Sequence, residues 1–138
     1  MIERLPKYRV IQYFFSNEKR NYRSYNVVQM DFEGTKIIAI GENNERYYFD
    51  FKAVDGLVQY TELNDSNDNQ IFEHDIVEYK QTSLGGYDDM IGIVKFMEGA
   101  WCIVNNDRKI AIPLFSETAE IKIIGNIYND LDLLREED

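Results

Sequence analysis

The sequence predicts a mainly β protein. Ten Tyr and eight Phe stand against only two Pro among 138 residues, and aromatic and β-branched residues favour strands. Hydrophobic residues make up 44% of the chain, which supplies a core although 29% of the residues are charged. Short apolar runs alternate with turn-forming clusters about every 8–12 residues, a spacing typical of small barrels and sandwiches.

The first half reads as a β-meander. The aromatic run YRVIQYFF predicts a strand over 8–15, and polar residues 16–21 follow as a turn. A second strand is expected over 26–32, where period-two alternation places Val28, Met30 and Phe32 on one face. Two further strands are expected over 35–40 and 47–51. Gly56 is a plausible boundary, which gives an N-terminal β-rich region over 1–56 and a second region over 57–138, with one intertwined domain as the alternative.

The rest of the chain is organised around residues 57–77, LVQYTELNDSNDNQIFEHDIV. Two apolar runs flank the polar cluster 64–69, a pattern that predicts a β pair joined by a hairpin-like loop. Further strands are expected over 76–79, 90–97, 100–104, 110–114 and 119–123.

The C-terminus holds the best helix candidate. Asn129 or Asp130 is placed to cap a short turn that contains Leu131, Leu133 and Leu134. Before it, alternation ends at Ile124 and Gly125 follows, so we expect a bend there that needs glycine's tolerance of unusual φ/ψ.

Charge is unevenly spread along the chain. The formal net charge is −10, but residues 1–25 hold six Lys or Arg and two Glu, a net charge of +4. Tyr and Phe interleave with these cations, as in grooves that bind single-stranded nucleic acid. The candidate contacts to nucleic acid or another partner are Arg4, Lys7, Arg9, Lys19, Arg20 and Arg23. The alternative is a solvated basic face over aromatics that pack inward.

No catalytic constellation is visible, so we expect a protein that is not an enzyme and needs no cofactor or metal. His74 and Cys102 are the single histidine and the single cysteine, and Cys102 is expected to be mostly buried in a strand. Residues 64–75 match part of a calcium-loop spacing, but Asn69 replaces the required glycine and the flanks read as strands. A polar hairpin loop explains the same residues.

The composition also bears on the compartment. A lone cysteine cannot form an internal disulfide, and neither a signal peptide nor an apolar run of membrane-spanning length is seen. We therefore expect a soluble, cytoplasmic protein that does not contact a membrane.

Two segments, 57–77 and 123–134, resemble the signature stretches of the YopX family, small phage and prophage proteins of largely Gram-positive bacteria. The matching residues include Gln59, Tyr60, Thr61, Asp75, Gly125 and Asn126, which we interpret as structural. The chain departs from the family pattern at Glu62, Asp68 and His74, where glycines are usual. The resemblance implies a β-rich fold with an SH3-like barrel, and it brings no catalytic residue.

The function expected from these observations is that of a phage or prophage accessory protein in the host bacterial cytoplasm, acting as a non-catalytic protein-interaction module. A nucleic-acid-associated protein that uses the basic edge, or an acidic mimic of DNA, is the alternative. The protein partner is unknown, and self-association is open.

Overall fold

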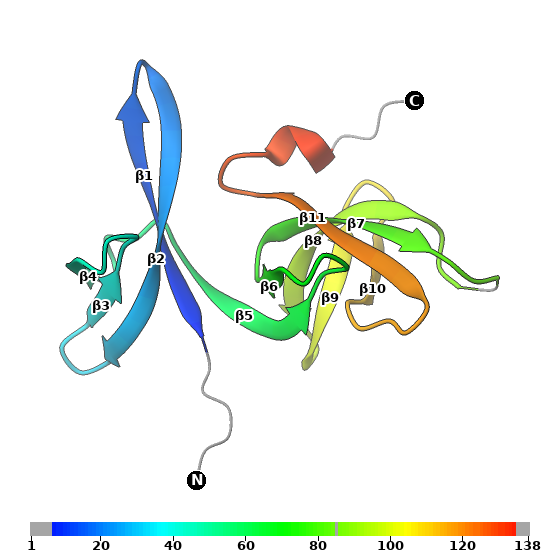
Figure 1. Cartoon of the computed structure of the whole chain (residues 1–138), viewed down its shortest axis with the longest axis horizontal. Coiled ribbons are helices and arrows are strands. Elements are labelled where there is room, and N and C mark those ends of the chain that lie inside the picture. Colours follow the sequence, from blue (N-terminus) through cyan, green and yellow to red (C-terminus); the bar gives the residue numbers. More distant parts are fainter. Residues whose placement is uncertain (1–6, 85, 135–138) are drawn as a thin grey trace, which may run out of the picture. The chain divides into compact units, whose positions relative to one another are not determined.

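The computed structural model describes residues 7–84 and 86–134, which are almost entirely β. The described strands are β1 (Tyr8–Ser16), β2 (Lys19–Asp31), β3 (Lys36–Ile40), β4 (Arg46–Asp50), β5 (Gly56–Asn64), β6 (Gln70–Phe72), β7 (Asp75–Gln81), β8 (Met90–Met97), β9 (Ala100–Asn105), β10 (Ile110–Pro113) and β11 (Ala119–Asn126). A single 3-10 turn, η1 (Leu131–Leu134), is the one helical element of the described residues. The predicted fold class, mainly β, is confirmed (Figure 1).

The strands form two antiparallel sheets, ordered β4-β3-β2-β1-β5-β6 and β10-β9-β8-β7-β11. The chain divides into two compact units, which we call the N-terminal unit (up to Gln59) and the C-terminal unit (from Tyr60). Strand β5 belongs to both. It pairs with β1 over residues 56–59, and with β6 at Tyr60 and Asn64.

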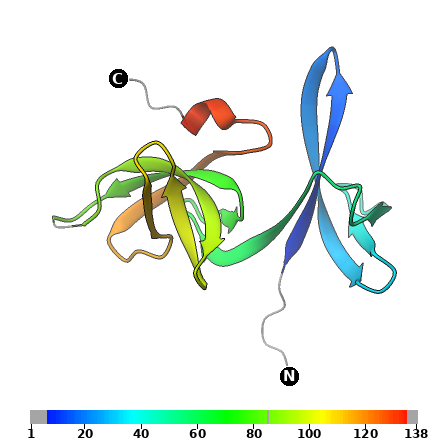
Figure 2. The same ribbon diagram turned by 180° about the vertical axis from the view of Figure 1, so that it is seen from behind.

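The N-terminal unit contains the predicted meander, with one long hairpin. Asn17 and Glu18 both have positive φ, so β1 and β2 are joined by a tight turn of two residues. Residues 19–21, which were expected to belong to the turn, therefore pair with β1, and β2 is 13 residues long. Figures 1 and 2 both show the tip of this hairpin projecting away from β3 and β4.

A β-bulge overturns the expected faces of β2. Val27 pairs with Ala39 and Gln29 pairs with Ile38, so Val28 is an extra residue and the alternation shifts by one. Val27 consequently packs on the core, whereas Val28 is 50% exposed. Phe32 lies beyond the strand, where it is 76% exposed and stacks on Phe51. The prediction that Val28, Met30 and Phe32 share one face of a strand is wrong, because the bulge shifts the alternation at Val28 and Phe32 lies beyond the strand.

The core of the N-terminal unit is small. Val10, Ile37 and Ala39 are fully buried. Partly buried residues from β2, β4, β5 and the segment between β4 and β5 pack around them: Tyr25, Val27, Phe49, Phe51, Val54 and Leu57.

The C-terminal unit has the larger core, which one face of the five-stranded sheet covers. Its buried cluster includes Val77 and Val94 from central strands, and also Ile112 and Ile121 from the edge strands β10 and β11. Because both edges contribute to one cluster, the sheet curls around it. The strand pairings of the described residues leave this sheet open, so they do not form the closed SH3-like barrel that the resemblance implied.

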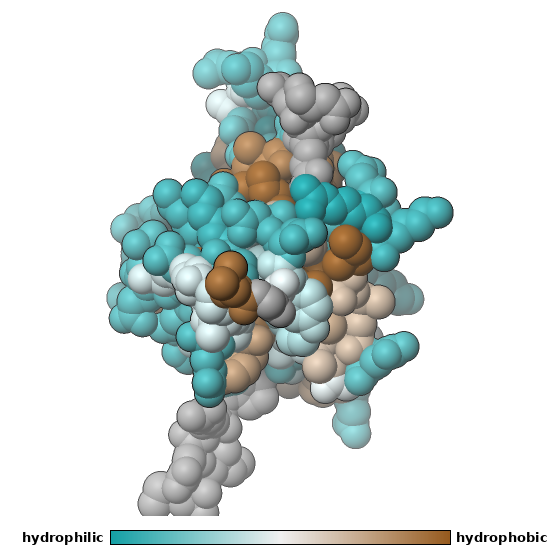
Figure 3. Space-filling view, turned by 90° about the vertical axis from the view of Figure 1, so that its right-hand side faces the viewer, coloured by the Kyte–Doolittle hydropathy of each residue, from teal (hydrophilic) through white to brown (hydrophobic). Residues whose placement is uncertain are grey.

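Figure 3 shows the hydropathy of one face of the molecule. Hydrophilic side chains cover most of the face in Figure 3, with apolar ones scattered among them. Within residues 7–84 and 86–134, no helix is long and apolar enough to cross a membrane.

The expected C-terminal helix is only the 3-10 turn η1. Leu131 and Leu133 are 54% and 38% exposed, and none of the four residues is buried. The Asp130 carboxylate accepts a hydrogen bond from the Asn126 N–H of β11, at 3.2 Å. This carboxylate therefore points to the preceding strand and not to the start of the expected helix. So short a segment cannot sustain an α-helix by itself.

Candidate interaction surface and the signature network

The polar cluster 64–69 is the loop of a hairpin, as the sequence predicted. Asn64 pairs with Gln70 across the two strands, and the Asp65 N–H donates to the Asn69 carbonyl oxygen at 2.8 Å. Asp68 has a φ of 65°, and its N–H donates to the Asp65 carbonyl oxygen at 2.9 Å. No group of three or more metal-ligating side chains lies together in the described part of the chain.

Asp65 holds the loop together from the inside. Its side chain is only 7% exposed, and Oδ1 accepts hydrogen bonds from the Asn67 and Asn69 N–H groups at 3.0 and 2.9 Å. Oδ2 accepts from the Ile123 N–H at 3.1 Å. Burial acts to raise the pKa of this carboxyl, but the three backbone N–H groups outweigh it and hold the pKa below the ordinary value of 3.8.

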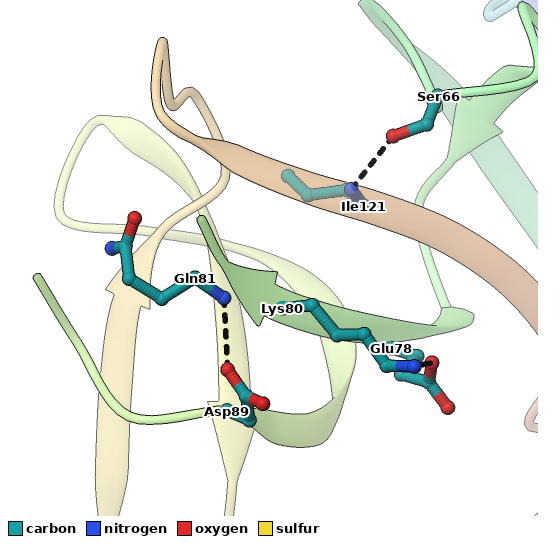
Figure 4. Close-up of polar contacts among 6 residues, drawn as sticks. All are labelled: Ser66, Glu78, Lys80, Gln81, Asp89 and Ile121. Carbon is teal, nitrogen blue, oxygen red and sulfur yellow. Dashed lines mark hydrogen bonds and ion pairs between the residues drawn. The ribbon is translucent and has the colours of Figure 1, made fainter. Parts of the chain in front are cut away.

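Ser66 attaches the same loop to β11. Its N–H donates to the Ile121 carbonyl oxygen at 2.7 Å, and its hydroxyl oxygen accepts from the Ile121 N–H at 3.0 Å. Figure 4 shows the second of these bonds. It also shows the Gln81 N–H donating to Asp89 of the β7–β8 loop. Together with the bond from Ile123 to Asp65, these contacts join the loop to the strand that leads into the second signature segment.

His74 makes the next connection between the two signature segments. Its Nδ1 lies 2.8 Å from the Tyr128 hydroxyl oxygen, and its carbonyl oxygen accepts from the Ile127 N–H at 3.1 Å. Burial lowers the pKa of the imidazole, and nearby Lys95 adds to this effect while Glu73 opposes it.

The other signature residues also make hydrogen bonds or strand pairs within the protein. The Thr61 hydroxyl donates to the Ile71 carbonyl oxygen at 2.7 Å, and the Asp75 carboxylate accepts from the Phe72 N–H at 2.8 Å. Asp75 pairs with Asn126 between β7 and β11, Gln59 pairs with Tyr8, and the Tyr60 hydroxyl donates to Asn64. Residues 60–77 and 123–134 therefore lie side by side in the C-terminal unit, joined mostly through backbone groups.

Gly125 differs from the expectation. The register shift between Ile123 and Gly125 makes Ile124 a bulge, and the strand continues to Asn126. The φ of Gly125 is outside the left-handed region, so the expected need for an unusual backbone angle is wrong. A Cβ atom there would instead lie 2.6 Å from Asp130 Oδ2 and 2.8 Å from Asp130 Cβ. Glycine leaves room for the carboxylate that binds the Asn126 N–H.

The candidate cations are distributed over both faces of the β1–β2 ribbon. Opposite residues of an antiparallel pair share a face, and the register places Asn26 opposite Arg9 and Phe15 opposite Arg20. Arg9 and Arg20 thus lie on one face, and Lys19 and Arg23 on the other. Lys7 precedes β1, and Arg4 lies outside the described residues. The strand pairing does not gather these cations into a single patch.

Near the hairpin tip, arginine side chains stack on aromatic rings. The Arg20 guanidinium lies 4.3 Å from the centroid of the Tyr13 ring, and that of Arg23 lies 4.4 Å from the Phe14 centroid. Phe15, the next residue of β1, is 77% exposed. We call Tyr13, Phe14, Phe15, Arg20 and Arg23 the hairpin-tip surface, which covers both faces of the ribbon and is the candidate interaction surface of the N-terminal unit.

A surface pocket of about 550 Å³ adjoins the base of this hairpin. Its lining residues come from β2, β4 and the loop before β4, and include Tyr22, Arg23, Tyr25, Glu42, Glu45 and Tyr47. The Tyr47 hydroxyl donates to Glu45 at 2.9 Å, and this hydrogen bond raises the pKa of the tyrosine. The pocket offers both carboxylates and aromatic rings to the solvent.

Cys102 is less buried than expected. It lies in β9 next to Ile103, which points into the core cluster and is fully buried. Alternation therefore directs Cys102 to the other face of the sheet, where it is half-buried.

Comparison with known proteins agrees with this fold. The YopX protein family model matches residues 7–135. The crystal structure of the protein yopX from Bacillus subtilis superposes with a TM-score of 0.56 at 16% sequence identity, covering 94% of this chain and 98% of that one. No curated protein matches the sequence. The family model spans nearly the whole chain, and the chain therefore belongs to the YopX family.

Proposed function

We propose that the chain is a non-catalytic protein-interaction module, an accessory protein of phage or prophage origin that acts in the host bacterial cytoplasm. The observation that carries the proposal is the hairpin-tip surface, where Phe15 is 77% exposed on a projecting ribbon that holds two arginine–aromatic pairs, one on each face. Aromatic and arginine side chains are enriched in the energetic centres of protein interfaces.

The stacked arginines support a protein partner with an acidic or polar rim. Each guanidinium lies over a ring while its arginine remains exposed, so its charge can bind a carboxylate of the partner. Less side-chain entropy is then lost when the partner binds.

Single-stranded nucleic acid is the second candidate, favoured by the same arginine–aromatic pairs. It ranks lower because Arg20 and Arg23 occupy ring faces on which bases would stack. The cations also lie on both faces of the ribbon, and the chain as a whole carries a formal charge of −10.

The test is affinity capture from host cells with three forms of the protein: wild type, Phe15→Ser/Arg20→Ser, and the control Phe115→Ser. Phe15 and Arg20 are opposite each other in the hairpin, and Phe115 is a 64% exposed phenylalanine of the C-terminal unit. We expect wild type and control to retain the same protein after nuclease treatment, and the double variant to lose it. Equal capture by the double variant would refute the role of the hairpin tip, and bound material that disappears with nuclease would favour nucleic acid.

A further inference from the structure

Strand β4 is an exposed sheet edge without the usual protection against pairing. Among the described residues it pairs with β3 alone, and Figure 1 shows it at the outer edge of the N-terminal unit. Its five residues, RYYFD, contain no proline, lysine or bulge, and Tyr48 is 69% exposed. Edge strands of this kind are ready to pair with another strand.

The other three strands at the ends of the two sheets have features that hinder pairing with another strand. Strand β6 has only three residues, and β10 has four and ends in Pro113. Strand β11 is bulged at Ile124 and alternates the charged residues Glu120 and Lys122 along its exposed face. Of the four strands that end the two sheets, only β4 is both regular and longer than four residues, and its two charged residues, Arg46 and Asp50, are of opposite sign.

The backbone register identifies which residues of β4 point outward. The Phe51 N–H donates to the Thr35 carbonyl oxygen at 3.0 Å, and the Gly41 N–H donates to the Glu45 carbonyl oxygen at 3.1 Å. Hydrogen-bonded pairs alternate with non-bonded pairs along an antiparallel ladder, so Tyr47 and Phe49 bond to β3. The backbone N–H and C=O groups of Arg46, Tyr48 and Asp50 therefore face away from the sheet.

The sequence of β4 is self-complementary about Tyr48. If two copies of the strand run antiparallel with Tyr48 at the centre, Arg46 of each copy lies opposite Asp50 of the other. Tyr47 of each copy then lies opposite Phe49 of the other. The backbone groups of Arg46 and Asp50 face outward, as those of Tyr48 do. The charge pairs between the two copies therefore form at the same positions as the new hydrogen bonds.

We propose that the chain forms a symmetric dimer by antiparallel pairing of β4 with β4 of a second copy, joining two N-terminal sheets into one. The contact is isologous, with its two-fold axis between the two Tyr48 residues. This surface is separate from the hairpin-tip surface, and the inference does not rest on the proposed function.

Four backbone hydrogen bonds form without rearrangement. The two Tyr48 residues exchange two bonds, and the Asp50 N–H of each copy reaches the Arg46 carbonyl oxygen of the other. The Asp50 carbonyl oxygen already accepts a hydrogen bond from the Ala53 N–H at 2.9 Å, so it is not counted.

The electrostatics of Asp50 favour the pairing. Lys36 lies 3.7 Å from its carboxylate, and the Lys52 N–H donates to it at 2.9 Å. These contacts, above all the bond from the Lys52 N–H, keep the pKa of Asp50 below its ordinary value. The carboxylate is therefore charged at neutral pH and available to Arg46 of the second copy.

A five-residue strand pair buries less surface than a standard protein interface, so we expect a dissociation constant on the order of micromolar. Sedimentation velocity over a dilution series should show monomer at low concentration and dimer at high concentration. A wild-type chain that stays monomeric well above this range would overturn the proposal.

Charge reversal supplies the decisive variants. Arg46→Asp and Asp50→Arg each place like charges opposite one another at two positions of the dimer, which should weaken self-association at least about tenfold. An equimolar mixture of the two variants restores both opposite-charge pairs and should dimerise like wild type. Self-association of either variant at wild-type strength, or a mixture that stays monomeric, would contradict the pairing.

Tyr48→Pro tests the backbone component. The N–H of Tyr48 points away from β3, so proline there removes an intermolecular bond and no bond of the sheet. We expect a monomer whose far-ultraviolet circular dichroism matches wild type. A Tyr48→Pro dimer of unchanged strength would refute the proposal, and the exposed Arg46→Asp variant keeps it testable if the proline disturbs folding.

Discussion

At the scale of single residues, the most informative positions are three that depart from the family's usual glycines. Glu62, Asp68 and His74 have φ values of 67°, 65° and 72°. The chain therefore keeps a left-handed backbone at all three sites although each carries a side chain. A residue with a Cβ is strained there, by roughly 1–2 kcal/mol.

Glu62 offers a clean test of this strain because its side chain is exposed. We expect Glu62→Gly to stabilise the protein by about 0.5–1 kcal/mol, the relief of strain less the added flexibility of glycine in the unfolded chain. Urea unfolding measures the change. Glu62→Ala removes the same carboxylate but keeps a Cβ, so it should give no such gain; equal stabilisation by both variants would point to the charge instead.

His74 predicts a pH dependence of stability. Burial lowers its pKa in the folded protein below the ordinary 6.5, so the unfolded chain binds protons more readily. The contribution of His74 to the free energy of unfolding is fully present above about pH 6.5. It is lost as the pH falls through the lowered pKa that His74 has in the folded protein. Neutral Nδ1 can also accept a hydrogen bond from the Tyr128 hydroxyl, and a protonated ring cannot.

The variant His74→Asn removes the titrating group and retains a residue that tolerates positive φ. Between pH 7 and pH 5, the melting temperature should fall more for wild type than for His74→Asn. Parallel curves for the two proteins would show that the histidine does not contribute to the acid sensitivity.

At the scale of elements, β11 is the strand on which the signature network converges. Ile121 and Ile123 bond to Ser66 and Asp65 of the β5–β6 loop, and Asn126 pairs with Asp75 of β7. Past its bulge, β11 needs glycine at position 125 so that Asp130 can approach. The connection is steric and depends on residues far apart along the chain.

We expect Gly125→Ala to destabilise the protein by about 1–3 kcal/mol, because its Cβ overlaps the Asp130 side chain and displaces the bond to the Asn126 N–H. Thermal melts measure the loss. In the double variant Gly125→Ala/Asp130→Gly the obstructing atoms are absent, so the added cost of the alanine should be small. A cost that persists in that background would indicate that the backbone, not Asp130, requires glycine.

At the scale of the whole molecule, the two units differ in the size of their cores. Of the described apolar residues that are buried, five lie in the N-terminal unit and fourteen in the C-terminal unit. Since apolar burial is the main stabilising contribution to folding, the N-terminal unit should be the less stable one.

Trp101, the only tryptophan, packs against the core of the C-terminal unit and reports on that unit. In urea, circular dichroism of the whole chain should begin to change before Trp101 fluorescence does. Ile37→Ala, costing about 2–5 kcal/mol in the N-terminal core, should shift the early change and leave the fluorescence midpoint in place. Ile103→Ala in the other core is the control that should move the fluorescence midpoint. Coincident shifts in both signals would mean that the units unfold together.

Local patterns in the sequence were enough for the β class, for most strand positions and for the hairpin loop at residues 64–69, because alternation and turn chemistry act between near neighbours. The resemblance of residues 57–77 and 123–134 to the YopX signatures likewise predicted the family. These features depend on side-chain types and spacing alone.

Only the tertiary structure decided which side chains share a face of a strand and which distant segments come into contact. The bulge at Val28 shifted the alternation of faces along β2. Strand pairing placed Arg9 and Arg20 on the opposite face of the ribbon from Lys19 and Arg23. The nearby Asp130 side chain explains why residue 125 is a glycine. The outward backbone of Arg46, Tyr48 and Asp50 likewise follows from pairing with β3. Each depends on register and contact between segments distant in sequence, and a shift of one residue in register exchanges the two faces of a strand.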